Sequence, residues 1–259
     1  MKNPFGMHEL PLTDLKNLGL IDSSDDLTID REDLDAILAG RLSKLLHMTN
    51  LEASGSRIDQ LDAKLSLYRE PDGKVAFRLH PIYHEPVIPS LLDDEEAEAL
   101  INGNEQSVVK TLPGPGKKEL VFEYDADTRA FISYDPARLI APDQINGYPL
   151  QDWQKDDFKK GYKIELPDGT ALHHRATDPK GIRADRAALI FSVLIDGGVS
   201  YLLLRGIHHL ANNSKPQEEG LTPAFQKAYA DMEKYFAAKG KTTATNNEEN
   251  RGYLKTRAR

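Results

Sequence analysis

The chain has 259 residues, of which 39% are hydrophobic and 29% are charged, a balance typical of a protein with a folded core. It contains no cysteine, which excludes disulfide bonds, thiolate zinc sites and cysteine nucleophiles. The formal net charge of −8 is unevenly spread: residues 1–106 hold 10 Lys/Arg and 21 Asp/Glu, giving −11, whereas residues 107–259 hold 23 and 20, giving +3. The acidic part repels nucleic acid at long range and suits a basic partner.

The first part of the chain predicts short helices and then an antiparallel hairpin. Residues 13–18 indicate one helical turn ended by Gly19, and residues 30–39 a second helix. The segments "AKLSLYR" (63–69) and "KVAFRLH" (74–80) alternate between apolar and polar residues on either side of a Pro-Asp-Gly turn, so we expect one buried face. The proline-rich "HPIYHEPVIPS" (80–90) ends this meander.

Three further hairpins are expected in the second half, with turns at 125–128, 167–169 and 196–198. The last of these has strands that are apolar on both faces, so we expect it to be the most buried. "KTLPGPGKKE" (110–119) is expected to be the internal boundary, because Pro-Gly-Pro-Gly sustains neither helix nor sheet.

Three segments share one helix pattern: 29–40, 92–103 and 150–161. Each begins with an apolar residue and carries an acid or amide at the second and fifth places, the spacing of a capping box. Each ends in a glycine, which we expect to adopt the left-handed conformation that closes a helix, at Gly40, Gly103 and Gly161. The acids of "LDDEEAEALING" are not kept in the third copy, where Trp153 and Lys155 stand instead of Glu95 and Ala97. We therefore interpret these acids as helix structure and not as a catalytic or metal site.

The predicted fold class is α+β, with antiparallel hairpins and meanders, short capped helices, and two related modules at 1–109 and 118–211. Residues 212–259 read as a linker, a helix and a disordered basic tail. In that helix Thr222 is the expected cap, Pro223 the first residue and Gly240 the end. Its apolar face is expected to dock on the chain's own sheet; a partner-binding helix is the alternative. The face comprises Phe225, Tyr229, Met232 and Phe236.

Two stretches of the chain resemble paired domain families of unknown function. The first covers roughly 5–105 and rests on "ELPLTDLKNLGL", "LDAILAGR" and "LDAKLSLYREPDGK" with "RLHPI". The second covers roughly 118–200 and rests on "PDQING" with the helix that follows it, and on "ALIFSVLI". The resemblance implies an accessory protein of conjugative transposons of gut anaerobes, where these families sometimes accompany type IA topoisomerases. It supplies no activity and no catalytic residues.

The residues that could carry chemistry form no recognised motif. "PGPGKK" lacks the ending of a phosphate-binding loop, and "ASGSR" lacks the flanks of a nucleophile elbow. Pro81 rules out a regular helix between His80 and His84, so these two are not at helical metal-ligand spacing. The other histidines come as adjacent residues, at 173–174 and 208–209. Neighbours on a strand point to opposite faces, so each pair offers at most one inward metal ligand. We expect no metal, no cofactor and no enzymatic activity. Trp153 is expected to pack against the protein.

Two functions stay open beside a third, an enzyme of unrecognised type, which would require a pocket with convergent polar groups that the sequence does not name. The first is a non-enzymatic accessory protein whose acidic first half docks a protein partner of the same mobile element. The second is a nucleic-acid-binding accessory factor that uses basic residues of the second half and the tail. Its candidates are Lys117, Lys118, Arg183, Arg186, Arg251, Lys255, Arg257 and Arg259. The start of the chain lacks the apolar run of a signal peptide, and no segment has the length of a membrane span, so a cytoplasmic location is expected.

Overall fold

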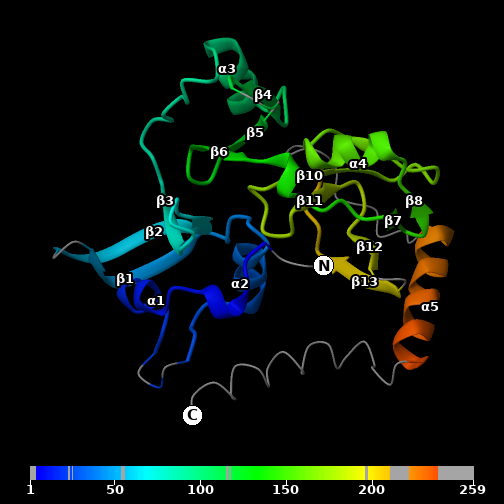
Figure 1. Ribbon diagram of the computed structural model, residues 1–259, viewed down its shortest axis with the longest axis horizontal. Helices are drawn as coiled ribbons and strands as arrows, with labels where there is room; N and C mark the ends of the chain where they lie inside the picture. Colours follow the sequence, from blue (N-terminus) through cyan, green and yellow to red (C-terminus); the bar gives the residue numbers. More distant parts are fainter. Residues whose placement is uncertain are drawn as a thin grey trace.

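The computed structural model describes residues 4–22, 24, 26–53, 56–114, 116, 118–195, 198–210 and 222–238. Within these residues the chain forms four antiparallel sheets with short helices around them, and the predicted α+β class is confirmed. Figure 1 shows three units: an N-terminal unit (residues 4–81), a middle unit (92–134) and a C-terminal unit (136–238) that ends in a long helix at the edge of the molecule.

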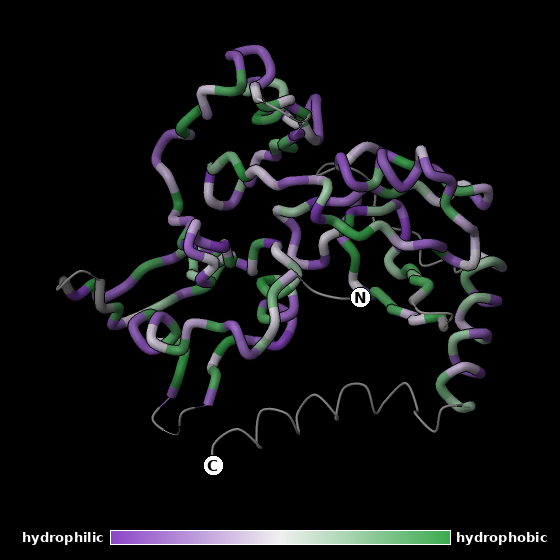
Figure 2. Tube along the Cα trace, viewed as in Figure 1, coloured by the Kyte–Doolittle hydropathy of each residue, from purple (hydrophilic) through white to green (hydrophobic). Residues whose placement is uncertain are grey.

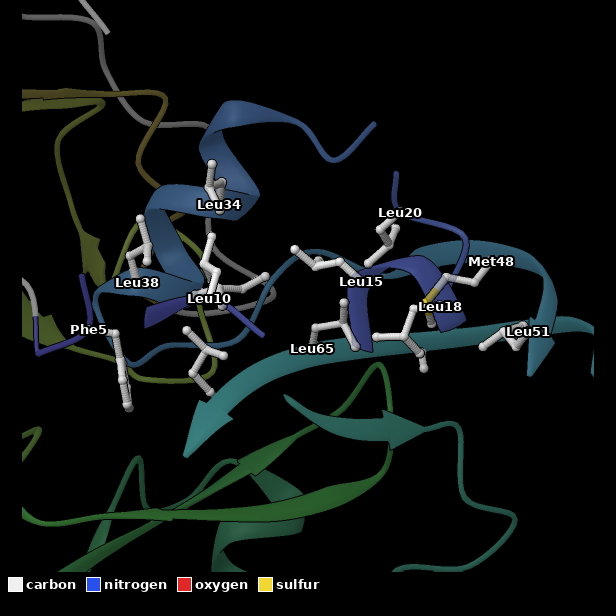
Figure 3. Close-up of a cluster of buried hydrophobic side chains, with 13 residues drawn as sticks. Phe5, Leu10, Leu15, Leu18, Leu20, Leu34, Leu38, Met48, Leu51 and Leu65 are labelled. Carbon is white, nitrogen blue, oxygen red and sulfur yellow. The ribbon is translucent and has the colours of Figure 1, made fainter. Parts of the chain in front are cut away.

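The N-terminal unit packs short helices on one face of a three-stranded sheet ordered β1-β2-β3. Its elements are η1 (Met7–Glu9), α1 (Leu12–Asn17), α2 (Arg31–Leu38), β1 (Leu46–Ala53), β2 (Ser56–Arg69) and β3 (Val75–Pro81). The hairpin predicted at 63–80 is confirmed, with Leu65 opposite Leu79. Leu65 and Leu67 are buried in a leucine-rich core whose other residues come from both helices, from β1 and β2, and from the segments that connect these elements. Figure 3 shows this cluster around Leu65. The sheet has one strand, β1, that the sequence did not predict.

The middle unit contains one helix and a sheet ordered β4-β5-β6. Its elements are α3 (Asp94–Asn102), β4 (Val108–Leu112), β5 (Lys118–Asp125) and β6 (Ala130–Tyr134). The hairpin predicted with its turn at 125–128 is confirmed, since Asp125 pairs with Ala130. Leu112 pairs with Lys118, so the segment expected to separate two modules is instead a hairpin connection within one sheet. Prolines and glycines suit such a connection as well as they suit a linker.

The C-terminal unit holds two small sheets, ordered β11-β10-β9 and β13-β12-β7-β8. Its elements are η2 (Pro136–Arg138), β7 (Gln144–Ile145), β8 (Tyr148–Pro149), α4 (Asp152–Lys159), β9 (Ile164–Glu165), β10 (Ala171–His174), β11 (Ile182–Ala184), β12 (Ala188–Ile195), β13 (Gly198–Arg205) and α5 (Pro223–Ala238). The hairpins predicted around 167–169 and 196–198 are confirmed by the β9–β10 and β12–β13 pairings. The last hairpin is buried along residues 189–193 of β12, whereas Leu194 of β12 is 61% exposed and Leu202 of β13 is 39% exposed.

Helix α5 packs its apolar face on β12 and β13. Phe225 and Met232 are buried against Ile190, with Tyr201 and Leu203 beside them. The Thr222 hydroxyl oxygen accepts a hydrogen bond from the Phe225 N–H at 3.1 Å, which is the expected N-cap. The helix therefore docks on the chain's own sheet, as expected.

The three similar helices differ in how they begin. In α3 the capping box is complete: the Glu96 N–H donates to the Asp93 carboxylate at 2.9 Å, and the Asp93 N–H donates to the Glu96 carboxylate at 3.0 Å. In α4 the Gln151 N–H donates to the Gln154 side-chain oxygen at 3.0 Å. In α2 the expected box is absent, because buried Asp33 accepts instead from the Lys44 N–H at 2.6 Å. All three ends place glycine in the left-handed region, with φ of 78° at Gly40, 73° at Gly103 and 75° at Gly161.

Gly103→Val should lower the free energy of unfolding by about 1 kcal/mol or more. No atom lies within 4 Å of a Cβ built at Gly103, so the cost comes from its φ of 73° and not from a clash. Urea unfolding of the full chain measures this effect. Glu95→Gln changes an exposed residue of the same helix and should leave stability unchanged. Equal midpoints for Gly103→Val and the parent chain would contradict the helix-end argument.

Candidate functional site

The basic residues predicted to bind nucleic acid do not gather on one surface. Lys118 is exposed at the start of β5, whereas Arg183 lies in β11 and Arg186 follows it. The Arg183 side chain is only 20% exposed, and its Nε is 3.6 Å from the Asp178 carboxylate. Arg186 is 4.0 Å from Asp185. The remaining candidates lie outside the described residues: Lys117, Arg251, Lys255, Arg257 and Arg259.

Two more basic residues of the second half make contacts inside the molecule. Arg175, the first residue after β10, donates to the Gln106 backbone oxygen at 3.2 Å and to the Tyr124 backbone oxygen at 2.8 Å, and so connects the end of β10 to the middle unit. Lys180 forms an ion pair with Glu32 of α2. Their charges therefore serve contacts between units, and less of the second half's positive charge reaches solvent than its composition suggests.

These contacts converge on the loop between β10 and β11, residues 175–181, which we call the junction loop. On the middle unit it binds Glu123, whose carboxylate is buried. That carboxylate accepts hydrogen bonds at 3.0 Å from the Ala176 N–H, the Thr177 N–H and the Thr177 hydroxyl. Burial raises the pKa of Glu123, while nearby Arg175 and these three donors act against that shift.

On the N-terminal unit the junction loop binds the residues that follow α2. The Leu42 N–H donates to the Ala176 backbone oxygen at 3.1 Å, and Arg41 Nε donates to the Pro179 backbone oxygen at 3.1 Å. Burial lowers the pKa of Arg41 to about 10, with Asp178 and Asp35 acting in the opposite direction. Gly181, at φ 73°, allows this approach, because a Cβ there would lie 2.6 Å from the Arg41 side chain.

A second polar contact joins the N-terminal and middle units. Lys64 of β2 is 3% exposed, and its Nζ donates to the Asp125 carboxylate at 2.7 Å and reaches Asp127 at 2.8 Å. The Thr128 hydroxyl donates to the other Asp125 oxygen at 2.6 Å. Glu123 and Asp125 were not predicted as site residues, although both fall on the same strand face as Val121 in "ELVFEYD".

The adjacent histidines of β10 are both buried, contrary to the expectation that only one would point inward. The sheet that carries them is covered on both faces, so alternation along the strand does not expose either ring. Burial lowers the pKa of His173 to about 4 and of His174 to about 3, with Arg175 and Arg41 respectively lowering them further. The His174 ring contacts Tyr134 and Phe158 at centroid distances of 5.3 and 5.7 Å. Both histidines are neutral core residues at neutral pH.

His80 and His208 also have structural partners. His80 is hydrogen-bonded to the Ser66 hydroxyl at 2.8 Å, and burial lowers its pKa to about 4. His208 Nδ1 lies 2.7 Å from the carboxylate of buried Asp178. Across the described ranges, no three His, Asp or Glu side chains are grouped to hold a metal ion.

Trp153 does not pack as expected, because 62% of its side chain is exposed in the first turn of α4. Helical spacing places Gln154 and Phe158 on the inner face of α4, where both are buried, and turns Trp153 away from it. The residue type favoured burial, but its position in the helix decided its exposure.

The acids of α3 and of the segment before it lie in a stretch without basic residues. Residues 82–105 contain Glu85, Asp93, Asp94, Glu95, Glu96, Glu98 and Glu105, and no Lys or Arg. Glu96 pairs with Lys110 of β4, whereas Asp94, Glu95 and Glu98 face solvent. We call these three the α3 acids. Residues 82–91, the crossover segment, run without helix or strand from β3 to α3 (Figure 1).

Residues 5–90 match the model of a family described as a protein of unknown function (DUF4099). The match covers the N-terminal unit and most of the crossover segment, and agrees with the resemblance noted for this part of the chain. The resemblance of residues 118–200 stays a prediction. No curated protein and no solved structure matches the chain. None of the described helices has the length and apolar character to cross a membrane.

Lys64→Met should lower the free energy of unfolding by about 3 kcal/mol or more, because it leaves the Asp125 carboxylate buried without its cation. Urea unfolding of the full chain measures the loss. Adding Asp125→Asn should recover part of it, since the amide oxygen still accepts from Thr128. Lys74→Met removes an exposed ion pair with Asp72, which solvent screens, and should change the free energy of unfolding far less than Lys64→Met does. Equal losses for Lys64→Met and Lys74→Met would show that the buried pair adds nothing.

The free energy of unfolding should fall as the pH drops below the ordinary histidine pKa of 6.5, because the unfolded chain then binds protons that buried His173 and His174 do not. The loss should continue until the pH approaches their folded pKa values of about 4 and 3. In His174→Phe the unfolded chain no longer takes up a proton at this position. The free energy of unfolding of the variant, relative to that of the parent, should therefore rise by about 1 kcal/mol for each pH unit below 6.5. Urea midpoints across this range measure the difference. His84→Phe, at an exposed position, is the control, and parallel curves for all three proteins would refute the assignment.

Proposed function

We propose that the chain is a non-enzymatic docking module of a mobile genetic element, and that its partner is a protein with a basic surface. One observation carries this proposal: the α3 acids face solvent in a stretch without Lys or Arg, whereas Arg175, Lys180 and Arg183 make contacts inside the molecule. Charge complementarity between an acidic face and a basic partner increases the rate and the specificity of association.

The titratable groups of the junction support docking over chemistry. Glu123 uses its carboxylate oxygens to hold the junction loop, and His173 and His174 are buried and neutral. A catalytic acid or base needs a reactive atom within reach of a substrate. These groups hold sheets and loops together instead. The assignment to a conjugative transposon rests on the resemblance of residues 5–105 and 118–200; the family matched at 5–90 is one of unknown function.

The second candidate is a nucleic-acid-binding accessory factor. It is favoured by the exposed position of Lys118 and by the four basic residues of the C-terminal sequence, Arg251, Lys255, Arg257 and Arg259. Binding through such residues would release counterions and fall steeply with salt.

The test compares protein and DNA binding by the full chain at low and moderate salt. The α3 acids are changed together to lysine (Asp94→Lys, Glu95→Lys and Glu98→Lys), and affinity for each protein encoded on the same element is measured by biolayer interferometry. Binding to one basic protein should weaken about tenfold or more in this variant, because attraction becomes repulsion. The control variant carries the same charge change at three other exposed acids: Asp59→Lys, Asp152→Lys and Glu233→Lys. It should keep most of the affinity.

DNA binding is measured in parallel, by fluorescence anisotropy of labelled single- and double-stranded DNA. Little binding to either DNA, even at low salt, is the expected result. Tight and salt-dependent DNA binding, together with equal protein affinities for the two lysine variants, would replace the docking function with the nucleic-acid one. A chain ending at Ala211 would then show whether the tail carries the DNA binding.

A further inference from the structure

The crossover segment exposes an unusual concentration of large apolar side chains. Val87 is 72% exposed, more than any other large hydrophobic residue of the described chain. Four others within ten residues are also exposed: Ile82 at 45%, Tyr83 at 39%, Ile88 at 43% and Leu91 at 38%. Single apolar residues are common on protein surfaces, but a contiguous group of them is typical of an interaction site. Figure 2 shows the hydrophobic positions along this stretch.

The segment is fixed at both ends by the rest of the protein. The Tyr83 N–H donates to the Thr128 backbone oxygen at 2.9 Å, and Arg129 donates to the His84 backbone oxygen at 3.0 Å. At the other end, Leu92 is buried in the core of the middle unit and its N–H donates to the Pro89 backbone oxygen at 3.0 Å. The segment is thus held between two units, and its exposure is a property of the folded protein.

Three prolines restrict the backbone of this region further. Pro81, Pro86 and Pro89 each fix one φ angle near −65° and disfavour the helical conformation at the residue before them. A segment restricted in this way loses little conformational entropy on binding. The prolines also lack N–H groups, so the segment is a poor strand to add to the edge of a partner's sheet. Its side chains, and not a ladder of backbone hydrogen bonds, would have to make the contact.

The surroundings of the segment define the charge of its partner. Glu85 lies within it, the α3 acids follow it, and residues 82–105 contain no Lys or Arg, although Arg129 contacts the first end of the segment through the His84 backbone oxygen. We infer that the crossover segment is the part of the acidic face that enters an apolar groove of a partner protein, and that Lys and Arg side chains line the rim of that groove. This inference rests on the proposed docking function and states which residues make the apolar contact.

The experiment uses a probe of the inferred chemistry, a labelled synthetic peptide of Leu and Lys at helical spacing that presents an apolar stripe flanked by lysines. Its binding to the full chain is followed by fluorescence anisotropy. Val87→Asp with Ile88→Asp should weaken binding about tenfold or more, because two carboxylates would enter an apolar contact. Leu12→Asp with Leu194→Asp is the matched control, since these residues are 62% and 61% exposed elsewhere. It should leave binding unchanged.

Several results would overturn the inference. Equal binding by the two aspartate variants, no binding by the parent chain, or equal binding of a Leu and Glu peptide would each do so. If only the α3 lysine variant loses affinity, the acidic face docks its partner without the crossover segment, and the proposed function survives.

Two other occupants of the crossover segment would give distinct results. Self-association abolished by Val87→Asp with Ile88→Asp would show a second copy on the segment, and probe binding that appears only in a chain ending at residue 238 would show the tail there.

Milder variants keep the test independent of folding. Val87→Ser with Ile88→Ser removes the apolar surface without adding charge, and should also weaken binding, with an unfolding midpoint equal to that of the parent chain. Full affinity in this serine variant would show that the probe binds without the apolar side chains at positions 87 and 88, and would overturn the apolar contact.

Discussion

The arrangement of the three units depends on one buried carboxylate. Glu123 accepts three hydrogen bonds from Ala176 and Thr177, and these hold the junction loop against β5. The opposite side of the same loop then offers its backbone oxygens to Leu42 and Arg41. A charge removed from water is costly, and it is tolerated where several donors replace the lost water molecules. Seven consecutive residues thereby connect sheets that are far apart in the sequence.

This mode of assembly follows from the small size of the cores. The hydrophobic clusters of the three units are separate, and the middle one consists of few buried side chains. Hydrophobic contact is not directional, so it would not by itself fix how such units sit on one another. The Lys64–Asp125 pair and the junction loop supply directional contacts. The same contacts determine how the crossover segment is displayed, because one of its ends is bonded to the turn that follows Asp125.

Local features of the fold could be predicted from the sequence because they depend on neighbouring residues. The Pro-Asp-Gly turns, the Asp93–Glu96 box and the left-handed glycines are examples. Features that depend on distant residues could not. Asp33 occupies a cap position, yet it bonds Lys44 across the chain. The Pro-Gly-Pro-Gly segment has the composition of a linker, yet the strands on either side of it pair. Both histidines of β10 are buried because a second layer covers the face that alternation alone would expose.

The candidate docking site illustrates the limit of charge counting. The second half of the chain has an excess of basic residues by composition, but Arg175, Lys180 and Arg183 lie in or beside the junction loop and meet backbone oxygens, Glu32 and Asp178. The capping box of α3 uses Asp93 and Glu96, whereas Asp94, Glu95 and Glu98 face solvent. Asp94 and Glu95 lie in the first turn, where the helix dipole favours negative charge. These two residues thus serve both the helix and the surface that we propose for docking.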